Sequence, residues 1–288
     1  MTKPNSPKVS VLMPIYKTNE NHLCKSIESI LSQTFNDFEF LILDDCPTDD
    51  RKKIVERYTD NRIKYLKNDV NLGITDSRNK LLEIARGEYI AVMDHDDISL
   101  PNRFEKQVAY LDDHKDVGVV GSFIRKIVAD KIVSLPIENN DIKSGLMMKC
   151  VITHPASMIR KSILDENCIK YQKMYSPSED YKLWCDLIEH TNFYNIPEVL
   201  FEYRDHKNNT STNQQNKMEN ATLIIWAENE VKHPLLWKKF NLNQATHVKT
   251  FRLFGFIPFL KIKQKGRICK VFLFNILPII KIKTSVKV

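Results

Sequence analysis

The chain has 288 residues, 42% of them hydrophobic and 27% charged, with a formal net charge of +7, which is enough for one large core or for a domain with an appendage. Its start lacks the apolar segment of a secretory signal, and its six cysteines form no CxxC pair, which argues against a secreted disulfide framework and a zinc site. We therefore expect a cytoplasmic protein with reduced thiols.

The excess of positive charge is confined to the end of the chain. Thirteen Lys and Arg residues and no Asp or Glu follow Glu230, so the first 230 residues carry a net charge of −6. Such an asymmetry indicates an anionic partner for the tail, either a membrane surface or nucleic acid.

Strand and helix patterns alternate through the first hundred residues. Buried-strand patterns at 8–16, 38–45, 62–68 and 88–94 are separated by helical patterns at 19–33, 47–58 and 73–87. This alternation predicts a parallel sheet with helices on both faces and right-handed crossovers. Ligands of such sheets bind beyond the carboxyl ends of the strands, so we expect the acidic groups that follow the second and fourth strands to share one cleft.

Two local details complete this part of the prediction. Thr48 or Asp49 is the expected N-cap of the second helix. The acidic groups are Asp44 with Asp45 and, after the fourth strand, the run 94–97.

The second half of the chain is less regular. Helical patterns occur at 102–114, 176–190 and 216–232, and strand patterns occur at 117–128, 131–136 and 198–206. After Lys232, apolar stretches (FRLFGFIPFL, VFLFNILPII) alternate with basic clusters, and neither stretch reaches the roughly twenty residues that span a bilayer. We expect no internal repeat.

Several segments together carry a resemblance to a known family. VSVLMPIY, LILDD, NLGITDSRNKLLEIARGEYIAVMDHDD, HPASMIRKS, SEDYKLW and YRDH stand in the order typical of family 2 glycosyltransferases, which the chain resembles from about Val9 to His206. The resemblance implies the α/β GT-A fold, a Rossmann-like, mostly parallel central sheet flanked by helices. It also implies an inverting, metal-dependent transfer of a sugar from a nucleotide diphosphate donor, above all a UDP-sugar, to an acceptor hydroxyl.

These patterns predict two parts of the chain. A GT-A domain is expected at 1–230, with the nucleotide-sugar half at about 8–100 and the acceptor and catalytic half at about 101–230. A basic, amphipathic and partly apolar extension is expected at 231–288. Its composition favours an anionic membrane surface over nucleic acid, and an ordinary helical extension packed on the domain is the alternative.

The acidic run after the fourth strand resembles the DxD motif of the family. By resemblance, Asp94 contacts the ribose side of the donor, and Asp96 binds a divalent metal, Mn²⁺ or Mg²⁺, that neutralises the diphosphate leaving group. His206, in the YRDH segment, is expected to approach the metal or the diphosphate. Seen alone, the run reads more simply as a solvated, helix-capping loop before Pro101.

Other residues match the nucleotide pocket of the family. By resemblance these are Pro14, Tyr16, Asp44 and Arg78. Three of them have a structural alternative: a core aromatic for Tyr16, a helix cap for Asp44 with Asp45, and a solvated helix face for Arg78. The glycine and serine that commonly follow the aspartate pair are replaced by Cys46 and Pro47, which puts the shape of this loop in question.

Asp180 matches the aspartate of the family's ED motif and is therefore the expected catalytic base. An inverting displacement needs a base that takes the proton of the attacking hydroxyl, and a carboxylate suffices. The alternative is a helix N-terminus that Glu179 and Asp180 stabilise by their charge, and one residue can do both. Glu179 is expected to support rather than react, and His154 is expected to line the acceptor side.

The acceptor that fits this reading is a glycan or lipid-linked glycan in surface glycan synthesis, such as capsule, O-antigen or lipooligosaccharide. A sugar nucleotidyltransferase is the main alternative, but the segment after the first strand, PIYKTNENH, lacks the Gly-rich phosphate loop of those enzymes. A catalytically silent carbohydrate-binding or scaffold protein is the third possibility. Retention of both the DxD and the ED positions argues against it.

Overall fold

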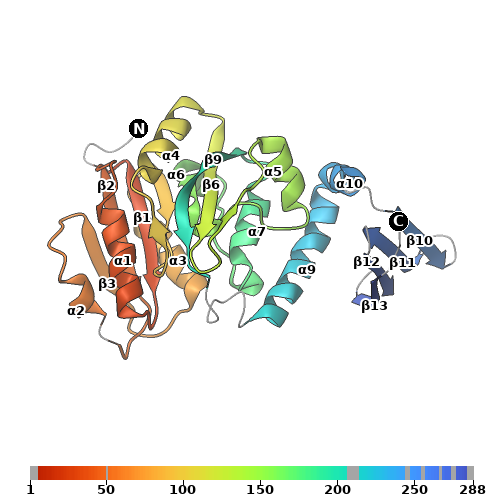
Figure 1. The fold of residues 1–288 in the computed structure, drawn as a ribbon, viewed down its shortest axis with the longest axis horizontal. Helices are drawn as coiled ribbons and strands as arrows, with labels where there is room; N and C mark the ends of the chain where they lie inside the picture. Colours follow the sequence, from red (N-terminus) through yellow and green to blue (C-terminus); the bar gives the residue numbers. More distant parts are fainter. Residues whose placement is uncertain are drawn as a thin grey trace. The chain divides into compact units, whose positions relative to one another are not determined.

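The structure is a computed structural model that describes residues 6–49, 51–205, 214–243, 247–253, 257–265, 268–273 and 277–283. The chain divides into two compact units, Met1–Asn229 and Glu230–Val288. Figure 1 shows the helices and strands of both units.

The first four strands of the chain form the parallel sheet that the sequence predicts (Figure 1). They lie in the order β3-β2-β1-β4, with the bounds β1 (Val9–Ile15), β2 (Phe38–Asp44), β3 (Ile63–Lys67) and β4 (Tyr89–Val92). Every residue of β1, β2 and β4 is buried. Their nearly continuous apolar sequences therefore reflect cover on both faces of the sheet.

Beyond β4 the sheet continues with strands of mixed direction, for nine strands in all. The order continues with β8 (Met158–Arg160), β6 (Val117–Lys126), β9 (Asn192–Tyr203) and β5 (Ile98–Ser99), and β7 (Lys131–Val133) pairs with β6. β8 runs antiparallel to both of its neighbours, whereas β9 is parallel to β6. The predicted fold class, an α/β sheet flanked by helices, is confirmed.

The described part of the first unit also contains eight helices and two short 3₁₀ turns. The helices are α1 (Glu20–Leu31), α2 (Lys52–Val55), α3 (Ile74–Ile84), α4 (Arg103–Asp113), α5 (Asn139–Leu146), α6 (Lys161–Glu166), α7 (Glu179–Asp186) and α9 (Gln215–Lys232), which extends into the second unit. The turns are η1 (His154–Ala156) and η2 (Lys173–Tyr175). The side chain of Asn19 caps α1 by accepting a hydrogen bond from the backbone N–H of His22.

The predicted helix at 47–58 is much shorter than expected. Only the single turn α2 is helical, and neither Thr48 nor Asp49 caps it, because the N-cap position is Arg51 and no side chain bonds there. The carboxylate of Asp49 instead accepts a hydrogen bond from Arg51 Nε at 2.7 Å.

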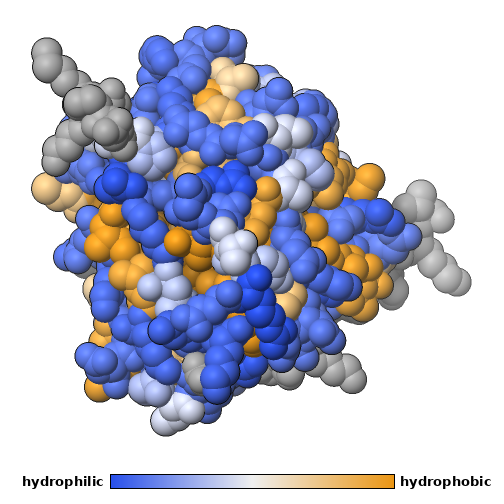
Figure 2. Space-filling view, turned by 90° about the vertical axis from the view of Figure 1, so that its left-hand side faces the viewer, coloured by the Kyte–Doolittle hydropathy of each residue, from blue (hydrophilic) through white to orange (hydrophobic). Residues whose placement is uncertain are grey.

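β3 is the outer strand of the sheet, on the side of the first unit that Figure 2 faces. This surface is largely hydrophilic, with hydrophobic residues showing in several separate patches (Figure 2). Lys64 and Lys67 are exposed on β3, and lysine on an edge strand discourages pairing with another chain.

The second unit is not the helical extension that was one of the alternatives. After α10 (Pro234–Asn243) it forms a four-stranded antiparallel sheet, in the order β10 (His247–Leu253), β11 (Ile257–Lys265), β12 (Ile268–Leu273) and β13 (Leu277–Lys283). Among the helices of the described residues, none has both the length and the apolar character needed to cross a membrane.

The expectation of no internal repeat is wrong for this unit. FRLFGFIPFLKIK at 251–263 and VFLFNILPIIKIK at 271–283 share Leu-Phe, proline and Lys-Ile-Lys at equivalent positions. The strand register also shifts at equivalent places, between Phe251 and Arg252 in one copy and after Val271 in the other. Conservative exchanges among Phe, Ile and Leu make this short repeat hard to see in the sequence.

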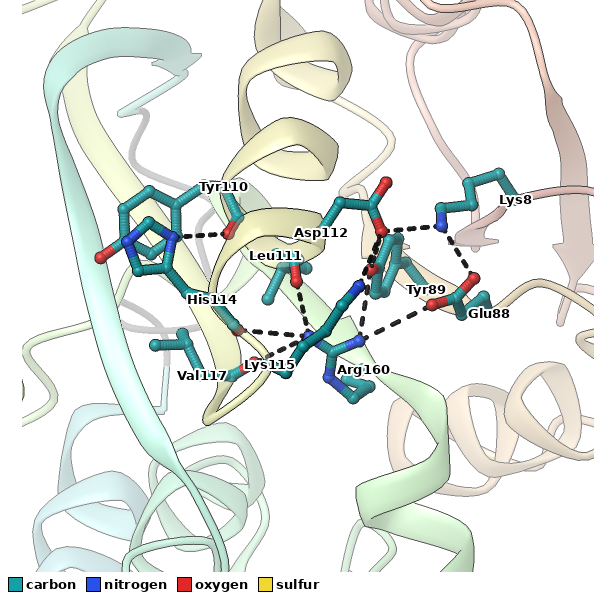
Figure 3. Close-up of polar contacts among 10 residues, drawn as sticks. All are labelled: Lys8, Glu88, Tyr89, Tyr110, Leu111, Asp112, His114, Lys115, Val117 and Arg160. Atoms are coloured by element: carbon teal, nitrogen blue, oxygen red, sulfur yellow. Dashed lines mark hydrogen bonds and ion pairs between the residues drawn. The ribbon is translucent and has the colours of Figure 1, made fainter.

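Arg160, at the end of β8, joins several elements near the start of β4, and its side chain is 12% exposed (Figure 3). Arg160 Nη2 donates to the backbone oxygens of Leu111, at 2.7 Å, and Val117, at 3.2 Å. Arg160 Nη1 donates to Tyr89 Oη at 3.2 Å and lies 3.7 Å from a carboxylate oxygen of Glu88. The guanidinium thus occupies the carboxyl end of α4, where helix carbonyls lack partners within the helix.

Replacement of this arginine is our first prediction. Arg160→Met keeps the aliphatic stem but leaves buried carbonyl groups without donors, so the free energy of unfolding should fall by about 3 kcal/mol. Urea unfolding measures the change. Arg57→Met, which breaks an exposed ion pair with Glu20, is the control and should change the stability little. Equal effects of the two substitutions would contradict the role given to Arg160.

Candidate active site

The polar segments that follow β1, β2 and β4 lie at one edge of the sheet, the lower edge in Figure 1. This is where the parallel topology predicts a ligand site. The side chains there come from the strand ends, from α3, and from α7 in the second half of the chain.

Arg78, on α3, connects the two predicted motifs. Its Nη2 donates to Asp94 Oδ1 at 3.2 Å, and its Nη1 donates to Glu179 Oε1 at 2.8 Å. Arg78 is only 8% exposed. Burial by itself lowers the pKa of its guanidinium, but the carboxylates of Asp94 and Glu179 outweigh burial and hold that pKa above its usual value. The DxD loop and the ED motif therefore meet through one buried cation.

Asp180 lies beside this ion pair on the first turn of α7 and is partly exposed. Its Oδ1 accepts a hydrogen bond from the backbone N–H of Tyr181 at 2.7 Å. Burial, and then the charge of Glu179, raise the pKa of Asp180 to about 6, while Arg78 acts in the opposite direction. A carboxylate with this pKa is mostly ionised at neutral pH and is a stronger base than an ordinary aspartate.

Asp97 fixes the position of the DxD loop through a buried hydrogen bond. It is 1% exposed, and its Oδ1 accepts a hydrogen bond from the backbone N–H of Arg204 at 2.7 Å. Burial and the charges of Asp94 and Asp96 raise the pKa of Asp97 well above its usual range. Arg204 Nε also donates to the backbone oxygen of Asp96 at 2.7 Å. Sequence analysis quoted Arg204 within YRDH but gave it no role.

A second buried arginine lies near the same loop. Arg103, at the start of α4, is fully buried, and its Nη2 donates to the backbone oxygens of Val92 and Ser157 at 2.9 Å each. Burial lowers the pKa of this arginine to about 9, and the charge of Asp97 acts in the opposite direction. Arg103 thus fixes the end of β4, from which the carboxylates project.

The aspartate pair after β2 bonds to the chain itself. Asp44 is fully buried, and its carboxylate accepts hydrogen bonds from Tyr65 Oη at 2.8 Å and from the backbone N–H of Cys46 at 2.9 Å. Asp45 accepts from the backbone N–H groups of Leu72 and Gly73, at 2.8 Å each.

Gly73 is the residue that turns the chain into α3. It has a φ of 83°, a left-handed conformation that favours glycine, and it occupies the N-cap position of the helix. By holding Gly73, Asp45 fixes the start of the helix that carries Arg78. The helix-capping alternative for the aspartate pair is wrong, because no side chain caps α2, and Asp45 instead holds the backbone just before α3.

The remaining nucleotide-pocket candidates lie at the end of β1. Pro14 is buried within the strand and pairs with Leu43 of β2. Tyr16 is 45% exposed, and Lys17 Nζ lies 5.3 Å from the centre of its ring. An exposed aromatic ring is more available for stacking than the core aromatic that was the alternative.

His154 and Tyr171 form a wall behind Arg78. His154 Nε2 and Tyr171 Oη are 2.8 Å apart, and Arg78 Cζ lies 5.7 Å from the centre of the Tyr171 ring. Burial and the charge of Arg78 hold the pKa of His154 well below its usual range, so the imidazole is neutral.

Asn79 fixes the backbone of this wall. Its side-chain oxygen accepts a hydrogen bond from the backbone N–H of Tyr171 at 3.0 Å, and its side-chain nitrogen donates one to the backbone oxygen of Tyr171 at 2.9 Å. Sequence analysis missed both residues. Asn79 stands next to Arg78 in a matching motif, which was a usable signal, whereas nothing in the sequence near Tyr171 indicates its place.

The carboxylates of the DxD loop fit a divalent cation that is shared with a ligand. Asp94 and Asp96 supply hard oxygen donors from one loop, with side chains 29% and 20% exposed. Among the described residues, no three or more His, Cys, Asp or Glu side chains form a group that could hold a metal. Mg²⁺ commonly binds one or two carboxylates together with substrate phosphates, and this donor set is of that type. His206 lies outside the described residues.

Comparison with known proteins decides the family. The family model described as glycosyl transferase family 2 matches residues 10–168. The chain belongs to this family. As a family 2 glycosyltransferase it is an enzyme with a nucleotide-sugar donor, and the two alternatives, a sugar nucleotidyltransferase and a silent binding protein, are not supported.

Two relatives illustrate the similarity. An uncharacterized glycosyltransferase of Methanocaldococcus jannaschii is 36% identical over 209 residues, which cover 69% of this chain and 71% of that protein. WfgD of Escherichia coli, a UDP-Glc:alpha-D-GlcNAc-diphosphoundecaprenol beta-1,3-glucosyltransferase, is 28% identical over 209 residues, covering 72% of this chain and 80% of that protein.

Solved structures share the fold. The S. aureus TarS fragment 1-349 in complex with UDP-GlcNAc aligns with a TM-score of 0.62 and 20% identity, covering 81% of this chain and 69% of that chain. The mannosyltransferase PcManGT of Pyrobaculum calidifontis, in complex with GDP-Man and Mn²⁺, aligns with a TM-score of 0.61 and 15% identity, covering 83% and 71%. At these identities the likeness shows the GT-A fold of this glycosyltransferase.

Opposite charges around Asp180 generate the second prediction. Arg78→Gln removes a positive charge that lowers the pKa of Asp180, so the acid limb of the kcat/KM profile should move from about pH 6 to higher pH. Glu179→Gln removes a negative charge that raises this pKa, so the limb should move to lower pH.

Initial rates of nucleotide release from pH 4 to pH 9, roughly the range over which carboxylates and histidines titrate, measure both shifts. Lys115→Gln, at an exposed position, is the control and should leave the limb in place. Shifts of the same sign in both active-site variants would contradict the arrangement described here.

Proposed function

We propose that this glycosyltransferase moves a sugar from a UDP-sugar to a hydroxyl of a lipid-linked glycan, with inversion, in the synthesis of a surface glycan such as capsule, O-antigen or lipooligosaccharide. The observation that carries the proposal is the Arg78 bridge, which brings the loop of Asp94 and the helix of Asp180 into one site. The UDP-sugar and the diphosphoundecaprenol acceptor in the name of WfgD, and the UDP-GlcNAc complex of TarS, support this choice of substrates.

On the donor side, we assign the nucleoside to the ends of β1 and β2. Tyr16 would stack on the base beside Pro14, and Asp44 would border the uracil from its buried position. Asp94 would accept hydrogen bonds from the ribose, next to its ion pair with Arg78. The guanidinium of Arg78 adds positive charge close to the path of the diphosphate.

We assign a divalent cation to Asp96, with Asp94 and the donor phosphates nearby and His206 as a further ligand. Mn²⁺ in the PcManGT complex supports this assignment. When bound, Mn²⁺ or Mg²⁺ stabilises the negative charge that develops on the departing diphosphate.

On the acceptor side, we assign the general base to Asp180. As the acceptor oxygen forms its bond to the anomeric carbon, the bond from that carbon to the diphosphate breaks, and the hydroxyl proton passes to the Asp180 carboxylate. The raised pKa of Asp180 favours this proton transfer at neutral pH. Glu179 holds Arg78 in place, and His154 with Tyr171 would shape the acceptor wall.

We further propose that 1–230 acts as the catalytic domain, on the cytoplasmic side, and that 231–288 contacts an anionic membrane surface where a lipid-linked acceptor is found. Nucleic acid is not expected as a partner. The charge asymmetry after Glu230 supports this division.

Removal of the base is the third prediction. Asp180→Asn keeps the size and the capping ability of the side chain but cannot take a proton, so transfer should slow by about a hundredfold or more. Donor affinity, measured by calorimetry with a UDP-sugar, should change little. Asp186→Asn on the same helix is the matched control and should keep most of the activity. A near wild-type rate for Asp180→Asn would leave this residue as a helix cap.

Removal of the cation ligand is the fourth prediction. Asp96→Ala should abolish the increase in UDP-sugar affinity that Mn²⁺ produces, because the carboxylate that links the cation to the protein is lost. Binding is measured with and without EDTA, and Asp113→Ala, at an exposed position on α4, is the control. Undiminished transfer in EDTA would exclude the metal role.

A further inference from the structure

Strand pairing divides the small sheet of the second unit into two unlike faces. Lys263 of β11, Lys270 of β12 and Lys281 of β13 are direct partners across neighbouring strands. Because alternate residues of a strand belong to the same face, Lys261, Lys265 and Lys283 share the face of this row. We call these six residues the lysine face.

The opposite face has a different composition. Ile262, Val271 and Ile280 are direct partners across the same three strands, and Cys269 pairs with Ile282. Lys249 of β10, the partner of Ile262, is the one lysine among the paired residues of this face. The repeated Lys-Ile-Lys motif produces this division in both copies, because its two lysines fall on one face and its isoleucine on the other.

The lysine face has a cost within the sheet. Like charges directly opposite each other on neighbouring strands are destabilising, and here three lysines stand in one row. No Asp or Glu follows Glu230 in the sequence, so this part of the chain contains no acid to neutralise them. Both copies of the repeat nevertheless carry the lysines. A negative partner outside the chain would compensate this repulsion.

We propose that the lysine face is a docking surface for the acidic phospholipid headgroups of a membrane. The ammonium groups of lysine suit phosphate as point charges, and each lysine near an anionic bilayer adds to the attraction. Single-stranded nucleic acid would require aromatic rings for base stacking. Among the paired residues on this face, Phe272 alone is aromatic, so the register favours lipid.

The two-faced register also determines the kind of binding. A planar membrane can contact only one face of a sheet at a time. The lysine face and the apolar row of Ile262, Val271 and Ile280 therefore cannot contact the same membrane at once. Docking through the lysine face is therefore electrostatic and involves no insertion of that apolar row. Such binding is reversible and is screened by salt. The inference rests on the membrane contact proposed above for 231–288, but not on the proposed donor and acceptor.

The test compares two full-length variants that lose the same charge. The first carries Lys261→Gln, Lys263→Gln, Lys281→Gln and Lys283→Gln. The control carries glutamine at four exposed lysines of the first unit, namely Lys25, Lys52, Lys115 and Lys131. Both are sedimented with vesicles of phosphatidylcholine alone and of phosphatidylcholine with phosphatidylglycerol.

Wild type should bind only the vesicles that contain phosphatidylglycerol and should be released as the salt concentration rises from about 0.1 to about 1 M. The lysine-face variant should bind at least about tenfold more weakly, whereas the control should stay close to wild type. A third variant with arginine at the same four positions of the lysine face should bind like wild type. It keeps the test decisive if the glutamine variant does not fold, as checked by circular dichroism.

Other results would overturn the inference. Equal binding to neutral vesicles, or binding that high salt does not weaken, would mean that the apolar face contacts the membrane. Equal losses in the glutamine variants of the two units would mean that net charge and not the lysine face attracts the lipid. Loss of binding in the arginine variant, or tighter binding to a single-stranded oligonucleotide than to acidic vesicles, would also refute it.

Discussion

Repulsion among the carboxylates of one loop is the constraint on which this structure depends. Asp94, Asp96 and Asp97 follow a buried strand, where like charges at close range are costly. Three arginines from distant elements act against this repulsion. Arg78 on α3 pairs with Asp94, and the charges of Arg103 on α4 and Arg204 after β9 act on Asp97. A site that attracts a cation to its carboxylates is thus already held together by cations of the protein.

This solution joins the two halves of the first unit. Arg78 comes from the half that begins with β1, yet its second partner, Glu179, begins α7 in the other half. Arg204 in turn reaches back to the loop after β4. The nucleotide-sugar and acceptor halves named from the sequence are therefore parts of one cooperative structure, because neither contains all the charges that its own loops require.

The sequence predicts the parts of this protein that depend on local pattern. The parallel order of β1 to β4 follows from the alternation of strands and helices, and the motifs around Asp94 and Asp180 indicate the family. The site roles of single residues stay predictions. Tyr171 and the role of Arg204 could not be predicted, because their contacts with Asn79 and Asp97 join segments about a hundred residues apart. The helical alternative for the tail is wrong for a different reason, because a short run that alternates Lys with Ile has the period of a strand.

The adjacent residues Arg78 and Asn79 have a consequence for how this family member can change during evolution. One reaches the donor loop, and the other fixes the backbone of Tyr171. A single residue inserted between Gly73 and Arg78 would turn both side chains by about 100° around the axis of α3. A substitution alters one of these side chains at a time. An insertion or deletion here would displace both at once, so the contact with the donor loop and the contact with Tyr171 would be lost together. The start of α3 should therefore tolerate changes of composition and almost no change of length.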